Sequence, residues 1–136
     1  MREILFRGKN LDTGEWVEGN YIHQTLYYGD EVDWHWIMVV GEFDCDYYDA
    51  YRIDPKTLCQ YTGFEDKNGK KIFEGDIVDA SCAHGIERAV MGFCYGHYQA
   101  FSQYYGYLYT RPNECEIIGN IHDNPELLNE GESSND

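Results

Sequence analysis

The segment Gln60–Val78, QYTGFEDKNGKKIFEGDIV, constrains the fold of this chain most, because it combines two reverse-turn signals with apolar and β-branched residues. Within it, Asp66–Gly69 contains an Asn-Gly pair that tolerates left-handed backbone geometry, which predicts a tight hairpin turn. Gly75-Asp76 predicts a second turn, and the β-branched residues that follow predict a strand over Ile77–Ala80. The centre of the chain is therefore expected to be antiparallel β-structure.

Further strands are predicted by alternation of apolar and polar residues and by aromatic and β-branched content. The first two flank a turn-rich stretch, Asn10–Glu15, and predict an N-terminal hairpin. Asp54-Pro55 predicts a turn or a single helical turn, and Glu42–Tyr51 has no clear period and predicts either a loop or a short helix. The predicted strands outside the central segment are Glu3–Gly8, Trp16–Ile22, Asp33–Val40, Glu87–Cys94, Tyr104–Thr110 and Cys115–Ile118.

The C-terminal part carries a helix-start signal in Asn124-Pro125-Glu126. Asn is a favoured N-cap, Pro is favoured at the first helical position, and Glu is stabilised by the helix dipole. We expect one domain over residues 1–130 and a disordered acidic tail over residues 131–136. The expected fold class is all-β and mainly antiparallel, with an SH3-like barrel-type core, an N-terminal hairpin and a short C-terminal helix.

The charge of the chain limits its partners. The net charge is −15, from 25 acidic and 10 basic residues, and such a surface repels phosphate backbones and anionic lipids. We therefore expect no direct nucleic-acid binding and no membrane binding. The start MREILFRG does not resemble a signal peptide, no apolar run approaches the ~20 residues of a membrane helix, and the five cysteines are irregularly spaced. These features predict a cytoplasmic protein with reduced thiols.

Three blocks of the sequence resemble the YopX family, found mostly in bacteriophages and prophages. They are FRGKNLDTGEWVEG near the start, QYTGFEDKNGKKIFEGDIV in the middle and EIIGNIHDNPELL near the end, in the order and rough spacing of that family. The resemblance implies a phage- or prophage-encoded protein of the bacterial cytoplasm with a β-barrel-like fold. It brings no catalytic residues with it, since the matching residues are also explained by turns, a strand and a capped helix.

Four residues are weak candidates for a metal site: Cys82, His84, Cys94 and His97. All are zinc-type ligands, but their spacing departs from the paired spacing of structural zinc sites. On a strand the first two would share a face, whereas the last two would not unless a turn intervenes at Gly96. The simpler interpretation is a loop His and one or two buried Cys, so we expect no metal and no cofactor.

The sequence contains no catalytic motif. A Cys with a His and an acid can always be assembled from five Cys and five His, and no Gly-rich phosphate loop is present. We therefore expect that the protein is not an enzyme, and a metal- or cysteine-dependent enzyme is the second alternative.

Aromatic residues provide the candidate binding surface: Trp34, Trp36, Tyr105, Tyr107 and Tyr109. They can be read as ordinary alternating strand faces, or as a binding surface, because Trp and Tyr are enriched in interface cores. Exposed together they would form an unusual patch on a monomer, which self-association would cover. The leading hypothesis is a non-catalytic protein-binding or structural module that forms a homo-oligomer, with a host or phage protein as a further partner. The alternative is an acidic nucleic-acid mimic that binds a basic host or phage protein.

Overall fold

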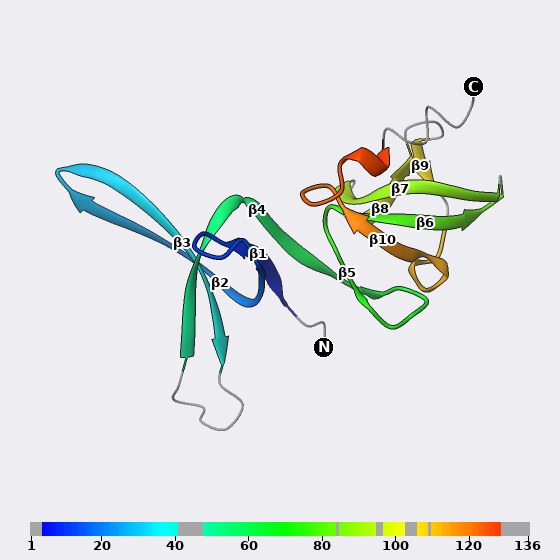
Figure 1. Cartoon of the computed structure of the whole chain (residues 1–136). Helices are drawn as coiled ribbons and strands as arrows, with labels where there is room; N and C mark the ends of the chain where they lie inside the picture. The colour runs from blue at the N-terminus through cyan, green and yellow to red at the C-terminus, as the bar shows by residue number, and fades with distance from the viewer. Residues whose placement is uncertain are drawn as a thin grey trace. The chain divides into compact units, whose positions relative to one another are not determined.

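The computed structural model describes residues 4–40, 48–83, 85–94, 97–102, 106–108 and 110–128 (Figure 1). The side chains of Tyr28, Val40, Tyr48, Cys94, His97 and Tyr107 are outside this description, as is the tail predicted over residues 131–136. The chain divides into two compact units, Met1–Gln60 and Tyr61–Asp136. A compact unit need not fold by itself, so the single domain expected from the length stays a prediction.

The N-terminal unit is a closed ring of four antiparallel strands: β1 (Phe6–Asn10), β2 (Trp16–Tyr28), β3 (Asp30–Val40) and the first part of β4 (Tyr48–Glu65). Each strand pairs with the next, and β1 also pairs with β4, which closes the ring. Where a strand pairs with a neighbour on each side, its backbone N–H and C=O groups are used on both edges. The predicted N-terminal hairpin is confirmed as the β1–β2 pair.

Two glycines allow the strands of the ring to approach closely. A Cβ on Gly19 would lie 2.2 Å from the carbonyl oxygen of Met38, and a Cβ on Gly8 would lie 2.5 Å from Cδ1 of Ile53. The side chains of Ile37 and Ile53 are 0% and 1% exposed. A larger residue at Gly19 would meet the Met38 backbone and force the strands apart, whereas one at Gly8 would displace the Ile53 side chain.

The prediction of a turn or a single helical turn at Asp54-Pro55 is wrong, because both residues lie inside strand β4. The local hydrogen bond of a turn is present: the Thr57 hydroxyl donates to the carbonyl oxygen of Asp54 over 2.7 Å. The β1–β4 register shifts between Arg7 and Lys9, and the strand resumes after this irregularity. A bulge therefore accommodates the proline without ending the strand.

The C-terminal unit holds the end of β4, which pairs with β5 (Lys71–Phe73), and a second antiparallel sheet of order β10-β6-β7-β8-β9. A 3₁₀ turn, Pro112–Glu114, precedes β10, and a short helix covers residues 126–128. The predicted fold class is confirmed: nearly all antiparallel β-structure with a closed four-stranded barrel and a short C-terminal helix. The strands of the second sheet are β6 (Asp76–Cys82), β7 (Gly85–Cys94), β8 (His97–Ser102), β9 (Gly106–Leu108) and β10 (Glu116–Asn120).

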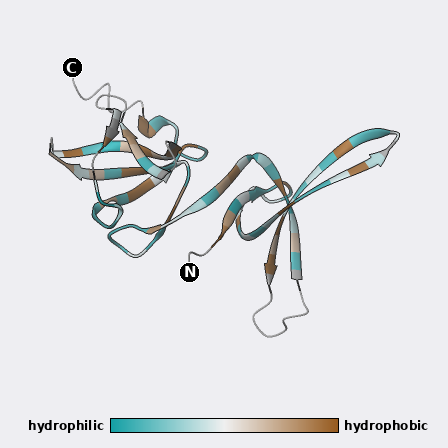
Figure 2. Ribbon diagram, turned by 180° about the vertical axis from the view of Figure 1, so that it is seen from behind, coloured by the Kyte–Doolittle hydropathy of each residue, from teal (hydrophilic) through white to brown (hydrophobic). Residues whose placement is uncertain are grey.

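The second sheet encloses the main hydrophobic core. Hydrophobic and hydrophilic residues alternate along its strands (Figure 2), and one set of side chains packs together. Small residues make up much of this core, which allows close packing around the larger ones. The core consists of Ile72, Val78, Ala80, Ala89, Met91, Ala100 and Cys115.

Both predicted turns of the central segment are present, and aspartates organise them. Oδ1 of Asp66 accepts hydrogen bonds from the N–H groups of Asn68 and Lys70 at 2.9 Å each, and Oδ2 accepts from Ile117 at 3.1 Å. Burial raises the pKa of Asp66, but the three N–H donors outweigh burial and the pKa is lowered. Asp76 accepts from the N–H of Phe73 at 2.8 Å in the same way. Both aspartates therefore have a structural role in the central segment.

The C-terminal helix starts where the sequence predicts, but the Asn124 side chain has another role. Its Oδ1 accepts from the N–H of Asn120 at 3.3 Å, while its backbone carbonyl accepts from Leu127 at 3.1 Å. A Cβ on Gly119 would lie 2.6 Å from Oδ1 of Asn124. The block GNIHDNPELL thus contains the end of β10, a tight turn over residues 121–125 and the helix.

Candidate functional site

The ends of β2 and β3 form a two-stranded arm, residues 20–36, which extends away from β1 (Figure 1). In the described part of the chain, β1 pairs with β2 only as far as Gly19, and β4 pairs with β3 only from Trp36 onward. The intervening residues of the arm pair across to each other. Two-stranded hairpins are marginally stable by themselves, so cross-strand side-chain contacts must hold the arm together.

One face of the arm carries a polar ladder, which we define as Tyr21, His23, Thr25, Asp33 and His35. The Thr25 hydroxyl donates to Oδ1 of Asp33 over 2.9 Å, and Nε2 of His23 lies 3.2 Å from the same oxygen. The Tyr21 hydroxyl lies 2.6 Å from Nδ1 of His35, and the two imidazole rings stack with centroids 4.6 Å apart. Each of these contacts joins β2 to β3.

Hydrogen bonding and burial shift the pKa values of two ladder residues, Asp33 and Tyr21. The hydrogen bond from Thr25, followed by that from His23, lowers the pKa of Asp33. Burial, followed by the nearby charge of Asp33, raises the pKa of Tyr21. The ladder contains no activated nucleophile, and the described residues include no group of three or more His, Cys, Asp or Glu that could hold a metal ion. Its chemistry is that of a cross-strand brace.

The opposite side of the arm is an aromatic face, which we define as Ile22, Leu26, Val32, Trp34 and Trp36. The register pairs Ile22 with Trp36 and Leu26 with Val32, and directly paired residues share a face of the sheet. The two indole rings lie 5.7 Å apart in a tilted arrangement. Ile22 is 40% and Val32 is 37% exposed, while both tryptophans are half-buried. Bands of hydrophobic residues mark the arm in Figure 2.

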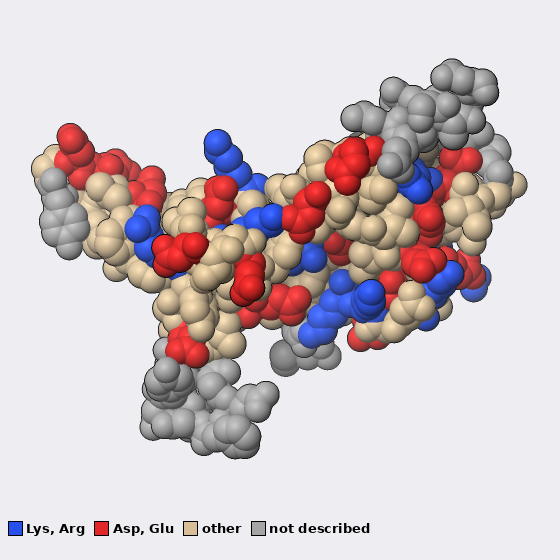
Figure 3. Space-filling model, in the orientation of Figure 1, with Lys and Arg blue, Asp and Glu red and all other residues tan. Residues whose placement is uncertain are grey.

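Opposite charges lie at the two ends of the aromatic face. Arg52 on β4 is the register partner of Trp36, and its guanidinium carbon lies 4.6 Å from the ring centroid of Trp34. Asp30 begins β3 at the tip and is exposed. Figure 3 shows the acidic residues of the arm gathered toward the tip, with Lys and Arg nearer to its base.

The predicted aromatic surface is only partly described in the structure. Trp34 and Trp36 lie together on the arm. Tyr107 is on β9, where its backbone pairs with Phe101. Its side chain lies outside the described residues, as do Tyr105 and Tyr109. A binding role for the five residues stays a prediction.

Sequence reasoning missed the polar ladder and the extent of the arm. The signal that could have found both is Gly29-Asp30, a turn pair between a Tyr-rich run and a Trp-rich run. Gly29 indeed has φ +87°, the left-handed geometry of a hairpin turn.

The weak metal candidates are only partly described. Sγ of Cys82 donates to the carbonyl oxygen of Gly85 over 3.3 Å, and Cys94 and His97 are register partners in the β7–β8 hairpin. His84 lies outside the described residues. The expectation that these four residues bind no metal stays a prediction.

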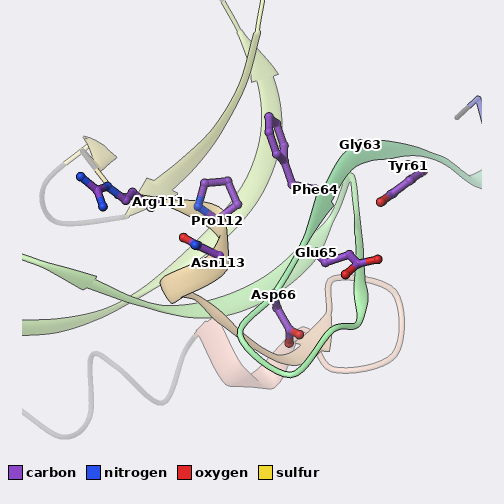
Figure 4. Close-up of a pocket in the computed structure, with 8 residues that line it drawn as sticks. All are labelled: Tyr61, Gly63, Phe64, Glu65, Asp66, Arg111, Pro112 and Asn113. Carbon is purple, nitrogen blue, oxygen red and sulfur yellow. The ribbon is translucent and has the colours of Figure 1, made fainter. Parts of the chain in front are cut away.

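An open groove of about 570 Å³ lies in the C-terminal unit (Figure 4). Phe64, which is 42% exposed, and Pro112 give it an apolar part, and Arg111 points away from them. The carboxylate of Asp66 is engaged by backbone N–H groups, so it is not available as an acid or a base. The lining residues are Tyr61, Gly63, Phe64, Glu65, Asp66, Arg111, Pro112 and Asn113.

Comparisons with known proteins agree with this fold. The crystal structure of protein EF1440 from Enterococcus faecalis is similar, with a TM-score of 0.51 and 23% sequence identity, over 94% of this chain and 99% of that chain. At this identity the likeness shows the fold alone. No curated protein matches the chain, and in the part of the chain that the structure describes no helix is long and apolar enough to cross a membrane. The model of the YopX protein family matches residues 5–129, so the chain belongs to the YopX family.

Proposed function

We propose that this protein is a non-catalytic protein-binding module that self-associates through the arm. The observation that carries the proposal is the aromatic face on a two-stranded arm. Trp is the residue type most enriched at the energetic centres of interfaces, and here two tryptophans are flanked by exposed Ile22 and Val32. Covering such a face with a second layer is how sheets ordinarily gain stability.

The polar ladder supports this proposal because it prepares the arm for binding. Hydrogen bonds from Thr25 and His23 to Asp33 tie the two strands together before any partner arrives. A pre-ordered surface loses less conformational entropy on binding than a flexible one. The ladder thus contributes to affinity without contacting the partner.

Family membership supports a phage or prophage origin and a place in the bacterial cytoplasm as further parts of the proposal. Cys59, Cys82 and Cys115 are free thiols, as a reducing compartment favours. As a further part of the proposal, the self-associated module binds a host or phage protein.

The charge pattern does not favour the acidic mimic of nucleic acid. On the face shown in Figure 3, the described acidic residues are interspersed with Lys and Arg. Some are in ion pairs, such as Lys67 with Glu116 at 3.2 Å and Arg88 with Asp79 at 3.5 Å. A mimic needs a continuous acidic face at phosphate-like spacing.

Sedimentation velocity of the full chain tests the proposal. The unmodified protein is expected to form a concentration-dependent oligomer, and Val32→Lys on the aromatic face is expected to shift it to the monomer, because a buried unpaired ammonium is costly. Tyr27→Lys is the matched control, since Tyr27 is 75% exposed and alternates onto the polar side of the same arm. A strictly monomeric unmodified protein at high micromolar concentration contradicts the proposal.

A further inference from the structure

We infer that the aromatic face is covered by the arm of a second copy, packed face to face about a two-fold axis, so that Asp30 of each copy meets Arg52 of the other. This inference rests on the proposed self-association and specifies its geometry. It follows from the order of side chains along one face of the arm.

The aromatic face has an acidic end and a basic end. Every second residue of a strand points to the same side, so Asp30 precedes Val32, Trp34 and Trp36 on one face of β3. Arg52 adjoins the other end as the register partner of Trp36. From tip to base, β3 and the adjoining Arg52 therefore present acid, apolar, aromatic and base, with the Arg52 guanidinium reaching back over Trp34 and Gln24 of β2 paired with Trp34 on the same face.

This order selects an antiparallel two-fold arrangement. In a two-fold contact, if one residue of the first copy touches a second residue of the other copy, the same pair also touches with the copies exchanged. With the axis between Val32 and Trp34, Val32 of each copy packs against Trp34 of the other. Asp30 of each copy then meets Trp36 and Arg52 of the other. The seven residues from Asp30 to Trp36 span roughly 20 Å, and both ends are paired at once.

The opposite, parallel arrangement is disfavoured by charge. It would place Asp30 of one copy against Asp30 of the other, and Arg52 of one copy against Arg52 of the other. Like charges brought together at an interface repel each other strongly. Arg52 can also serve two contacts at once. Its guanidinium lies over the ring of Trp34, and its planar fork of N–H donors remains suited to a carboxylate at its edge. The indole thus orients the arginine for the partner's Asp30.

A charge-swap experiment on the full chain tests this geometry, with dimer dissociation measured by sedimentation equilibrium. Asp30→Arg is expected to weaken the dimer by about tenfold or more, because each dimer contains two copies of the altered pair. Arg52→Glu is expected to weaken it similarly, and the double variant Asp30→Arg/Arg52→Glu is expected to recover most of the affinity. Glu31→Arg is the matched control, since it makes the same charge change one residue away on the opposite face.

The outcomes separate this inference from the proposed function. Weakening by Asp30→Arg but not by Glu31→Arg, with recovery in the double variant, supports the paired arms. A dimer that is insensitive to Asp30→Arg, or equally sensitive to Glu31→Arg, overturns this geometry while self-association stands. An unmodified protein that stays monomeric overturns both. If Arg52→Glu fails to fold, as judged by near-ultraviolet circular dichroism, the comparison of Asp30→Arg with Glu31→Arg decides.

Discussion

Single carboxylates organise this protein at the residue scale. Asp66 ties the central hairpin turn to β10 through three backbone N–H groups, and Asp33 ties the two strands of the arm through Thr25 and His23. The sequence shows that Asp66 lies in a turn, because its neighbours carry the turn signal. It does not show the bond to Ile117, which lies 51 residues away in the chain. Long-range polar contacts of this kind have no local signature.

The hydrogen bond from Thr25 predicts a measurable change in the titration of Asp33. In Thr25→Val the shape is nearly conserved but the largest cause of the lowered pKa is lost, so the pKa of Asp33 should rise toward its ordinary value of 3.8. Carboxyl ¹³C titration by NMR measures this. The pKa of Asp66 should stay lowered in the same sample, which provides an internal control.

The sign of the stability effect follows from the direction of that shift. The folded-state pKa of Asp33 is below its unfolded value, so the carboxylate stabilises the arm above pH 3.8, and this contribution is lost as the pH falls through the folded pKa. After correction for the intrinsic exchange rate, which itself falls on acidification, the protection of the arm amides should therefore decrease as the pH falls in the unmodified protein and change less in Thr25→Val. Equal responses in both proteins contradict a stabilising ladder.

Much of the strand layout could be predicted at the element scale, because alternation and turn residues are local signals. The N-terminal hairpin, the central turns and β7 are confirmed close to their predicted positions. The strand β8 (His97–Ser102) was not predicted, since it is short and lacks clear alternation. The closure of β1 onto β4 could not be predicted either, because it depends on glycines that permit contact between distant strands.

Gly19 is predicted to be essential to the packing of the ring. Gly19→Ala places a Cβ 2.2 Å from the carbonyl oxygen of Met38, so the β2 and β3 backbones must move, at a cost of about 1–3 kcal/mol in the free energy of unfolding. Denaturant unfolding measures this. Gly92→Ala in β7 is the control, since a Cβ there meets nothing within 4 Å, and its midpoint should change little. Equal stability of the two variants contradicts the close approach.

Strand β4 connects the parts of the fold at the scale of the whole molecule. It pairs with β1 and β3 in the N-terminal unit and, through Tyr61 and Glu65, with β5 in the C-terminal unit. The two paired parts of β4 are continuous in the chain, with Gln60 pairing in the N-terminal unit and Tyr61 in the C-terminal unit. This is the physical basis for keeping the expectation of a single domain, which the length of the chain first suggested.

The shared strand predicts one cooperative unfolding transition. Scanning calorimetry of the unmodified protein should give a calorimetric enthalpy equal to the van't Hoff enthalpy, and Gly19→Ala should lower the whole transition. Two separable transitions, with only one of them shifted by Gly19→Ala, would show that the units unfold independently.

The central claim is that the aromatic faces of two arms pack against each other in solution. An isotope-filtered NOE experiment on a mixture of labelled and unlabelled full chains observes that contact directly, because it detects only pairs of protons on different copies. The account predicts intermolecular NOEs between the methyl groups of Val32 and the indole of Trp34. An oligomer that shows intermolecular NOEs elsewhere, and none between these two residues, would contradict it.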